Sequence, residues 1–129
     1  MFQQYLMALG ETQVFITSLD KIIARIYPIS KWTENEILFE QGGENTEALA
    51  NIQFRANQFG ADSDIDSSGR VLMPQKLRQA LKLENQPVYL DCQKGRINVY
   101  SEAVYAELCE RVEKTLAEDL RTAEKMGLK

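Results

Sequence analysis

The stretch DIDSSGRVLMP, residues 64–74, places a carboxylate and a guanidinium four residues apart across a serine-glycine turn. An aspartate in such a turn accepts hydrogen bonds from backbone amides two or three residues on, and glycine adopts positive φ at little cost. Asp66 and Arg70 could therefore meet in a charge-assisted hydrogen bond. An arginine anchored in this way loses less side-chain freedom when it binds a phosphate or a guanine edge. The alternative is that the pair only fastens the turn.

The residues around this turn predict a hairpin-like loop that leads into a short helix. Ile65 before the turn and the apolar residues 71–73 after it are typical of strands. Pro74 cannot donate to a sheet and commonly occupies the first turn of a helix. In the helix and the residues that follow it, the expected buried contacts are Leu77, Leu81 and Leu83.

The composition argues against an enzyme. The 129 residues include no histidine, which removes Ser-His-Asp and Cys-His nucleophile systems and most catalytic zinc sites. The sequence also shows no phosphate-cradling glycine motif and no cluster of metal ligands. We therefore expect no enzymatic activity, no cofactor and no metal.

The same composition predicts a cytoplasmic protein. No apolar run approaches the roughly 20 residues of a membrane span, and the first residues do not resemble a secretion signal. Cys92 and Cys109 have no CxxC spacing, so we expect reduced, partly buried thiols.

The net charge of −4 disfavours a simple basic DNA binder, but the charge is unevenly distributed. Residues 66–101 contain six basic and three acidic side chains, and the segments on both sides are negative. We expect this segment to form a local basic face that meets phosphate. Candidate backbone contacts, each of which could instead be a solvated surface charge, are Lys76, Arg78, Lys94 and Arg96.

Two parts of the chain resemble each other, residues 14–32 and residues 88–105. Each contains an apolar strand, a short polar turn, a second strand that ends in a tyrosine, and then a predicted helix start. The offset is 74 residues in the first strands and 73 after the turns. Residues 2–14 similarly look like the counterpart of the helix at 74–88, with Phe2, Leu6 and Leu9 apolar. No counterpart of the Asp66–Arg70 turn stands before them in this sequence.

Three further helices are predicted. The first covers residues 30–41, where Trp32, Ile37, Leu38 and Phe39 supply apolar contacts. The second covers residues 46–59, with Thr46 as N-cap and with Leu49, Ile52, Phe54 and Phe59 expected in the core. The third begins after a Ser101 cap and runs to the end of the chain. Its apolar stripe is expected to pack on neighbouring elements, with a partner subunit as the alternative, and consists of Val104, Leu108, Val112, Leu116 and Leu120.

The second half of the chain resembles the MraZ proteins, which are bacterial transcription regulators within the AbrB-like group. Their D-x-x-G-R-x-x-x-P-x-x-L-R pattern is matched by Asp66, Gly69, Arg70, Pro74, Leu77 and Arg78. The first half is similar to the later part of the first MraZ repeat, including a Y-P-x-x-x-W ending at Tyr27, Pro28 and Trp32. The resemblance covers residues 2 to about 112.

This resemblance implies an α+β fold, a double-split, swapped-hairpin β-barrel with peripheral helices and two tandem repeats, the first incomplete at its N-terminus. The expected boundaries are 1–43 for the incomplete first repeat with its trailing helix, 44–60 for a connecting helix, 61–106 for the second repeat, and 107–129 for a C-terminal helix.

The resemblance also implies a DNA-binding regulator of the division and cell-wall gene cluster. It would bind double-stranded promoter DNA at short direct repeats, as a ring-like homo-oligomer at the nucleoid, without a small-molecule substrate. Arg70 would contact DNA, supported by Asp66, Ser68 and Gly69, with Lys76 and Arg78 as further contacts. The alternative is an assembly module that does not bind DNA and that oligomerises with, or modulates, a full-length partner.

Overall fold

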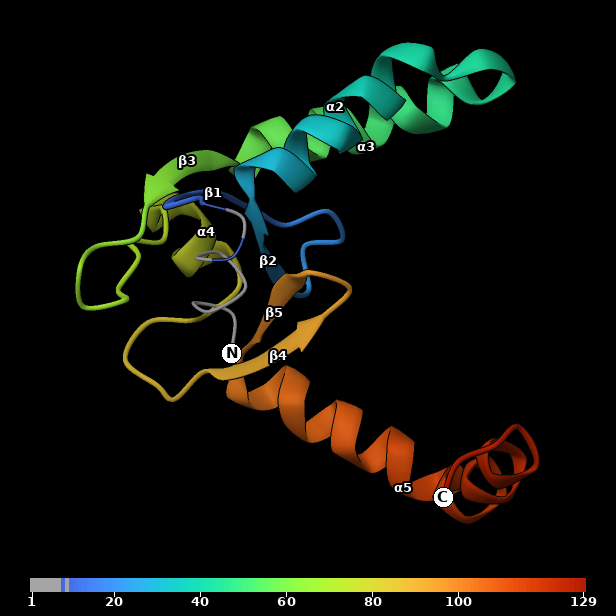
Figure 1. The fold of residues 1–129 in the computed structure, drawn as a ribbon. Coiled ribbons are helices and arrows are strands. Elements are labelled where there is room, and N and C mark those ends of the chain that lie inside the picture. Colours follow the sequence, from blue (N-terminus) through green and yellow to red (C-terminus); the bar gives the residue numbers. More distant parts are fainter. Residues whose placement is uncertain (1–7, 9) are drawn as a thin grey trace.

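The computed structural model describes residue 8 and residues 10–129, and these form the mixed α+β fold that was expected. The expected helix at residues 2–14, with Phe2, Leu6 and Leu9, lies largely outside the described residues. The elements, shown in Figure 1, are β1 (Gln13–Thr17), β2 (Ala24–Pro28), α2 (Ile29–Gln41), a short 3₁₀ turn η1 (Gly43–Asn45), α3 (Thr46–Phe59), β3 (Ala61–Asp64), α4 (Gln75–Ala80), β4 (Tyr89–Gln93), β5 (Arg96–Tyr100) and α5 (Glu102–Lys125).

All five strands of the described chain belong to one antiparallel sheet with the order β3-β1-β2-β5-β4. Within the described residues β3 and β4 are its two edges, so the sheet is open. The expected double-split barrel is therefore not confirmed by this sheet. An open edge leaves one row of backbone donors and acceptors without ladder partners.

The two similar segments both fold into a β-hairpin followed by a helix, β1–β2–α2 and β4–β5–α5. Their second strands pair with each other, and the register aligns Ala24 with Val99 and Ile26 with Ile97. Arg25, at the middle of this register, pairs with Asn98. The sequence offset of 73 makes Arg25 and Asn98 equivalent positions, and direct pairing of equivalent residues is what a local two-fold axis between the hairpins requires.

Strand β3 pairs with β1, although the expected domain boundaries place it in the second half of the chain. Phe15 pairs with Asp62, and Ile16 pairs with Ala61. The junction between α3 and β3 is tight: a Cβ at Gly60 would lie 2.3 Å from the Phe15 ring and 2.4 Å from the Ala56 carbonyl oxygen. Only a glycine fits between α3 and the sheet at this position.

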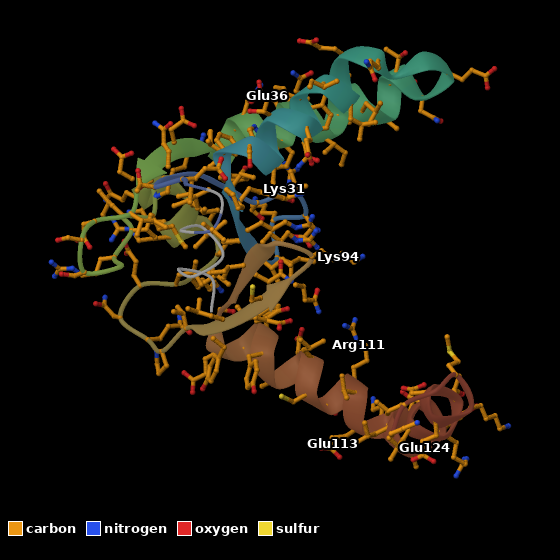
Figure 2. The ribbon with its side chains drawn as sticks, in the orientation of Figure 1. Lys31, Glu36, Lys94, Arg111, Glu113 and Glu124 are labelled. Carbon is orange, nitrogen blue, oxygen red and sulfur yellow. The ribbon has the colours of Figure 1, made fainter. Side chains whose placement is uncertain are left out.

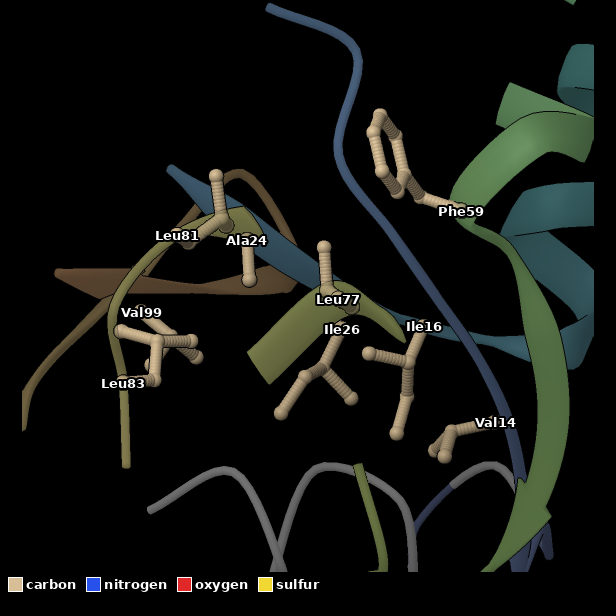
Figure 3. Close-up of a cluster of buried hydrophobic side chains, with 9 residues drawn as sticks. All are labelled: Val14, Ile16, Ala24, Ile26, Phe59, Leu77, Leu81, Leu83 and Val99. Carbon is tan, nitrogen blue, oxygen red and sulfur yellow. The ribbon is translucent and has the colours of Figure 1, made fainter. Parts of the chain in front are cut away.

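The core lies on one face of the sheet, where α4 and the residues after it cover β1, β2 and β5 (Figure 3). Leu77 has no exposed surface, and it packs with side chains from these three strands. Leu81 and Leu83 are also buried, which confirms the three contacts predicted for this segment. The other members of this cluster are Val14, Ile16, Ala24, Ile26, Phe59 and Val99.

Helices α2 and α3 form a hairpin that packs near β1 and β2 and then extends away from the sheet (Figure 1). Trp32 is buried, and its ring stacks on Phe15 with the centroids 4.4 Å apart. Phe59 is buried, and Phe39 and Leu49 are half-buried, so the expectation of apolar contacts is confirmed for these three residues. The expectation is wrong for Ile37, Leu38, Ile52 and Phe54, which are 39–71% exposed.

These four side chains are exposed because the sheet reaches only the end of the helical hairpin that carries Trp32 and Phe59. The start of α3 also differs from expectation. Thr46 is its first residue rather than its N-cap, and the Thr46 hydroxyl donates to the Gly43 carbonyl at 2.5 Å.

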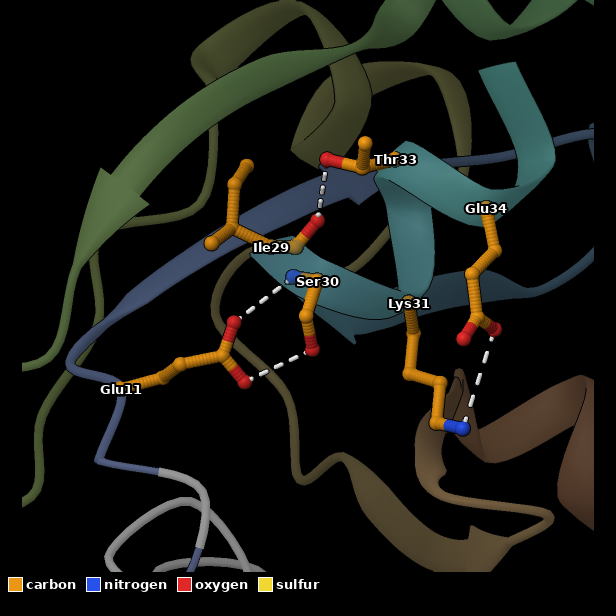
Figure 4. Close-up of polar contacts among 6 residues, drawn as sticks. All are labelled: Glu11, Ile29, Ser30, Lys31, Thr33 and Glu34. Carbon is orange, nitrogen blue, oxygen red and sulfur yellow. Dashed lines mark hydrogen bonds and ion pairs between the residues drawn. The ribbon is translucent and has the colours of Figure 1, made fainter. Parts of the chain in front are cut away.

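The start of α2 is held by a carboxylate from before β1 (Figure 4). Glu11 accepts a hydrogen bond from the backbone N–H of Ser30 at 2.7 Å and another from the Ser30 hydroxyl at 2.9 Å. A negative side chain at this position satisfies an otherwise unpaired helix donor and complements the helix dipole.

Helix α5 begins as predicted, because the Ser101 hydroxyl accepts from the Val104 N–H at 3.2 Å. The Tyr89 and Tyr105 rings stack with centroids 4.0 Å apart and fix the first turns of α5 to β4. The helix then projects beyond the sheet (Figure 1). The expected packing of its stripe on neighbouring elements of the same chain is therefore wrong for Val112, Leu116 and Leu120, which are 44–47% exposed.

The predicted boundary between 106 and 107 falls inside α5, which begins at Glu102. The predicted connecting helix at 44–60 corresponds to α3. Across residue 8 and residues 10–129, no helix combines the length and the apolar character that crossing a membrane requires.

The burial of Leu77 gives a test of this core. We expect Leu77→Ala to lower the free energy of unfolding by about 2–5 kcal/mol, because it removes apolar contacts and leaves a cavity. Leu72, which is 75% exposed, is the matched control, and Leu72→Ala should change the free energy by less than about 0.5 kcal/mol. Urea unfolding followed by circular dichroism measures both values, and equal effects of the two substitutions would contradict the described core.

Candidate nucleic-acid interface

The loop between β3 and α4 is organised around the carboxylate of Asp66. Its Oδ1 accepts hydrogen bonds from the backbone N–H groups of Ser68, at 2.9 Å, and Arg70, at 2.8 Å. Its Oδ2 accepts from Nε of the Arg70 guanidinium at 3.1 Å. The predicted contact between the two side chains is therefore present. The second backbone donor lies four residues on, rather than the two or three that were expected.

The backbone closes the same turn. The Asp66 N–H donates to the Arg70 carbonyl at 2.9 Å, and the Gly69 N–H donates to the Asp66 carbonyl at 3.0 Å. Gly69 has a φ of 78°, in the left-handed region that glycine adopts without a Cβ penalty. The turn thus brings together four of the predicted site residues, Asp66, Ser68, Gly69 and Arg70.

The expected strand after the turn is not formed. Residues 71–73 have no strand assignment, and the Leu72 carbonyl instead accepts from the Ser63 hydroxyl at 3.2 Å. Val71 and Met73 pack partly against the core, so the segment acts as an extended strap between the turn and α4.

The geometry holds Arg70 outward. Its side chain is 80% exposed, whereas that of Asp66 is 47% exposed. The hydrogen bond to Asp66 uses Nε, and the two terminal guanidinium nitrogens of Arg70 have no hydrogen-bond partner among the described residues. The donor edge that remains can form two parallel hydrogen bonds to a single acceptor group.

The charge state of Asp66 follows from the same contacts. The backbone N–H of Arg70 is the largest cause that lowers the pKa of Asp66, and the Ser68 N–H and the Arg70 side chain lower it further, against a smaller opposing effect of desolvation. Each of these donors favours the ionised carboxylate. At neutral pH Asp66 is therefore charged and can hold the arginine.

The two predicted contacts on α4 already have partners within the chain. The Lys76 ammonium lies over the Phe59 ring, 5.6 Å from its centroid. Arg78 lies 3.8 Å from the Glu84 carboxylate, and its Nε is buried without a hydrogen-bond partner in the described chain. Arg78 therefore braces the end of α4, and neither side chain joins the Asp66 turn.

The predicted single basic face is wrong. In Figure 1 the loop between β3 and α4 lies at the left of the molecule and the β4–β5 turn lies at the right. Lys94 and Arg96 flank this second turn, where they line a groove together with Arg25 and Lys31. Sequence reasoning did not single out Arg25 and Lys31, because only the pairing of β2 with β5 brings the two halves of the chain together here.

The two thiols also differ from expectation. Cys92 on β4 and Cys109 on α5 are both exposed rather than partly buried, and they do not form a disulfide.

Comparison with known proteins identifies the class to which this chain is related. Residues 60–126 match the family model described as "MraZ protein, putative antitoxin-like". The chain is 34% identical over 82 residues to a "Transcriptional regulator MraZ" of Acidobacterium capsulatum, with 64% of this chain and 56% of the relative covered. Proteins of the same name from Geobacter sp. (strain M21) and Desulfitobacterium hafniense (strain Y51) are 28% identical over 106 residues and 25% identical over 128 residues.

These relatives are transcriptional regulators by name. The family model matches more than half of the chain and includes the Asp66 turn, α4, β4, β5 and α5. The chain belongs to the MraZ family. The matched stretches span 56%, 66% and 83% of the lengths of the three relatives, and 80% and 94% of this chain for the second and third.

The contacts of Asp66 predict a pH dependence of the turn. Because the folded-state pKa of Asp66 is lowered, its stabilising effect is complete above the ordinary pKa of an aspartate and is lost as the pH falls through the lowered value. We expect the amide resonances of Ser68 and Arg70 to titrate with a midpoint below the usual aspartate range in NMR spectra.

Asp66→Asn is the control, because it keeps the side-chain shape but removes the titrating group. It should abolish this transition and increase the mobility of the Arg70 Nε–H at neutral pH. A midpoint at or above the ordinary aspartate value in the unsubstituted protein would contradict the described hydrogen bonds.

Proposed function

We propose that this chain is a sequence-specific DNA-binding transcriptional regulator that acts as a homo-oligomer and contacts DNA through Arg70. The observation that carries the proposal is the Asp66–Arg70 pair: the guanidinium is held through Nε, while its side chain is 80% exposed. Membership of a family whose relatives are named transcriptional regulators supports the proposed role.

The free edge of Arg70 suits base recognition. Two parallel N–H donors match the O6 and N7 acceptors of guanine in the major groove, and they also match two oxygens of a phosphate. The exposed Ser68 and the glycine at position 69 keep the tip of the turn small, so the duplex can approach the guanidinium closely. Asp66 acts as a positioning residue that limits the rotamers of Arg70.

Oligomerisation supplies the affinity that one turn lacks. A single arginine makes few contacts, and the chain as a whole carries a net charge of −4. In a ring of identical subunits, binding of one turn raises the effective concentration of the others at neighbouring sites. We propose short direct repeats in the promoter of the division and cell-wall gene cluster as the target, which places the protein at the nucleoid. Lys76 and Arg78 are secondary phosphate contacts in this proposal.

The same proposal includes two tandem repeats and a double-split barrel. Strand β3 covers the free side of β1, and the local two-fold axis at Arg25 and Asn98 relates β1 to β4. A counterpart of β3 would therefore pair with the open side of β4. Two apolar residues of this region, Val88 and Leu90, are 43% and 64% exposed, which supports an additional element that covers them. Added in trans or by fusion, such a strand would extend the sheet at β4, as the proposed barrel requires.

Substitution of the arginine tests DNA binding directly. We expect Arg70→Ala to weaken binding to a promoter fragment with direct repeats by about 5- to 150-fold per contacting turn, corresponding to about 1–3 kcal/mol for a lost bidentate contact. Arg70→Lys should rescue only part of this loss, because an ammonium cannot form the bidentate pair. A gel-shift titration at fixed salt measures the three affinities.

Arg121 on α5 provides the matched control, since it is an exposed arginine on a different element. Arg121→Ala should leave the affinity unchanged. Equal affinities of the unsubstituted protein and Arg70→Ala would refute the proposed contact. An assembled protein that binds no promoter fragment at all would instead favour the alternative, an assembly module without DNA binding.

A further inference from the structure

A groove on the side of the molecule away from the Asp66 turn combines positive charge with apolar surface. It lies between the α2–α3 hairpin and the β4–β5 turn and has a volume of about 410 Å³. We call it the basic groove. Figure 2 shows Lys31 and Lys94 on the same side of the molecule, at its two borders. The residues on which the argument rests are Arg25, Lys31, Lys94, Arg96, Leu38 and Ile52.

The positive charge of the basic groove is only partly compensated. Of the acidic residues, Glu34 lines it, and its carboxylate lies 3.7 Å from the Lys31 ammonium in an exposed pair. Arg25 donates from a terminal nitrogen to the Tyr27 hydroxyl at 3.1 Å, but its Nε is buried without a hydrogen-bond partner in the described chain. Four cations and one carboxylate thus meet in a chain whose net charge is −4.

The apolar part of the groove indicates a macromolecular partner. Leu38 and Ile52 are 54% and 39% exposed, and both belong to the uncovered surface of the α2–α3 hairpin. A small anion would neutralise the cations but would leave this surface in water. A partner that has an apolar stripe bordered by carboxylates would cover both.

Helix α5 has that composition. Its stripe of Val112, Leu116 and Leu120 is 44–47% exposed beyond the sheet. Glu113 lies three residues before Leu116, and Glu124 lies four residues after Leu120, so both are neighbours of the stripe on the helix surface. In Figure 2 Glu113 projects from the side of α5 opposite to Arg111, so one border of the stripe is acidic.

We propose that the basic groove binds α5 of a second copy of this chain. The apolar stripe contacts Leu38 and Ile52, and the acidic border faces Lys31 and Lys94. The inference rests on the proposed homo-oligomer and specifies its interface. The chain's own α5 does not reach the groove, because the Tyr89–Tyr105 stack fixes its first turns to β4 and the continuous helix leads away from the sheet (Figure 1).

This contact joins two different surfaces, the groove of one copy and the helix of the next. Such a heterologous contact closes into a ring when the rotation between copies permits, and otherwise propagates as a filament. The Asp66 turn lies on the other side of the molecule from the groove, so the interface leaves every Arg70 accessible.

Reciprocal charge reversal tests the interface. A groove variant, Lys31→Glu with Lys94→Glu, and a helix variant, Glu113→Lys with Glu124→Lys, should each reduce the assembly to the mass of one chain in light scattering coupled to size exclusion. In a mixture of the two variants, the groove of one variant can bind the helix of the other. Each such contact pairs opposite charges. The mixture should therefore regain the assembled mass, which a merely misfolded variant could not do.

Lys21 and Lys82 give the matched control. Like Lys94, both are exposed lysines with positive φ, and they do not line the groove. Lys21→Glu with Lys82→Glu carries the same charge change and should leave the assembled mass unchanged.

The outcomes separate the interface from the proposed function. An unsubstituted protein that assembles while both reversed variants assemble equally well would overturn the interface and leave DNA binding by Arg70 intact. A monomeric unsubstituted protein would overturn the proposed homo-oligomer together with its interface. Assembly of either variant alone to full mass, or no recovery on mixing, would also count against the groove as the site that binds α5.

Discussion

The pairing of β2 with β5 is the contact on which the rest of the structure depends. It joins two hairpins that are more than 70 residues apart in the sequence into one sheet, and its register is centred on Arg25 and Asn98. The core face of this joint sheet is what α4 covers with Leu77. The same pairing also has a consequence at the surface, where it places Lys94 and Arg96 beside Arg25 and Lys31 in the basic groove. Both the core and the basic groove are therefore products of one strand pairing.

Local chemistry allowed much of the fold to be predicted from the sequence. Strand alternation and the repeated order of hairpin and helix in the two halves predicted both hairpins, and Ser101 and Pro74 marked two helix starts. The predicted core failed for Ile52, Phe54, Val112 and Leu116, because hydrophobic periodicity shows which residues share a helix face but not whether anything covers that face. The missing strand at residues 71–73 had a similar cause, since β-propensity describes single residues and does not show whether a segment will form a ladder with a neighbouring strand.

The candidate site shows the same division between local and distant information. The Asp66 turn was predictable because its hydrogen bonds join residues no more than four positions apart. The distribution of basic residues was not, because a sum over a continuous segment ignores where the strands turn. Lys94 follows Arg70 within that segment, yet the β4–β5 turn that carries Lys94 lies on the other side of the molecule from the loop that carries Arg70 (Figure 1). The charge count along the sequence therefore found a real excess of basic residues. It assigned this excess to one surface, whereas the structure divides it between two.

The absent side chain at Gly60 has a mechanical consequence for the Asp66 turn. The Phe15 ring occupies the volume that any larger residue would need, so α3 can approach the sheet closely enough for β3 to align with β1. Strand β3 is four residues long and leads directly to the turn. A shift at the first residue of β3 would therefore also move the turn and the Arg70 guanidinium. The placement of the turn that carries Arg70 therefore depends on a residue without a side chain, one position before the first residue of β3.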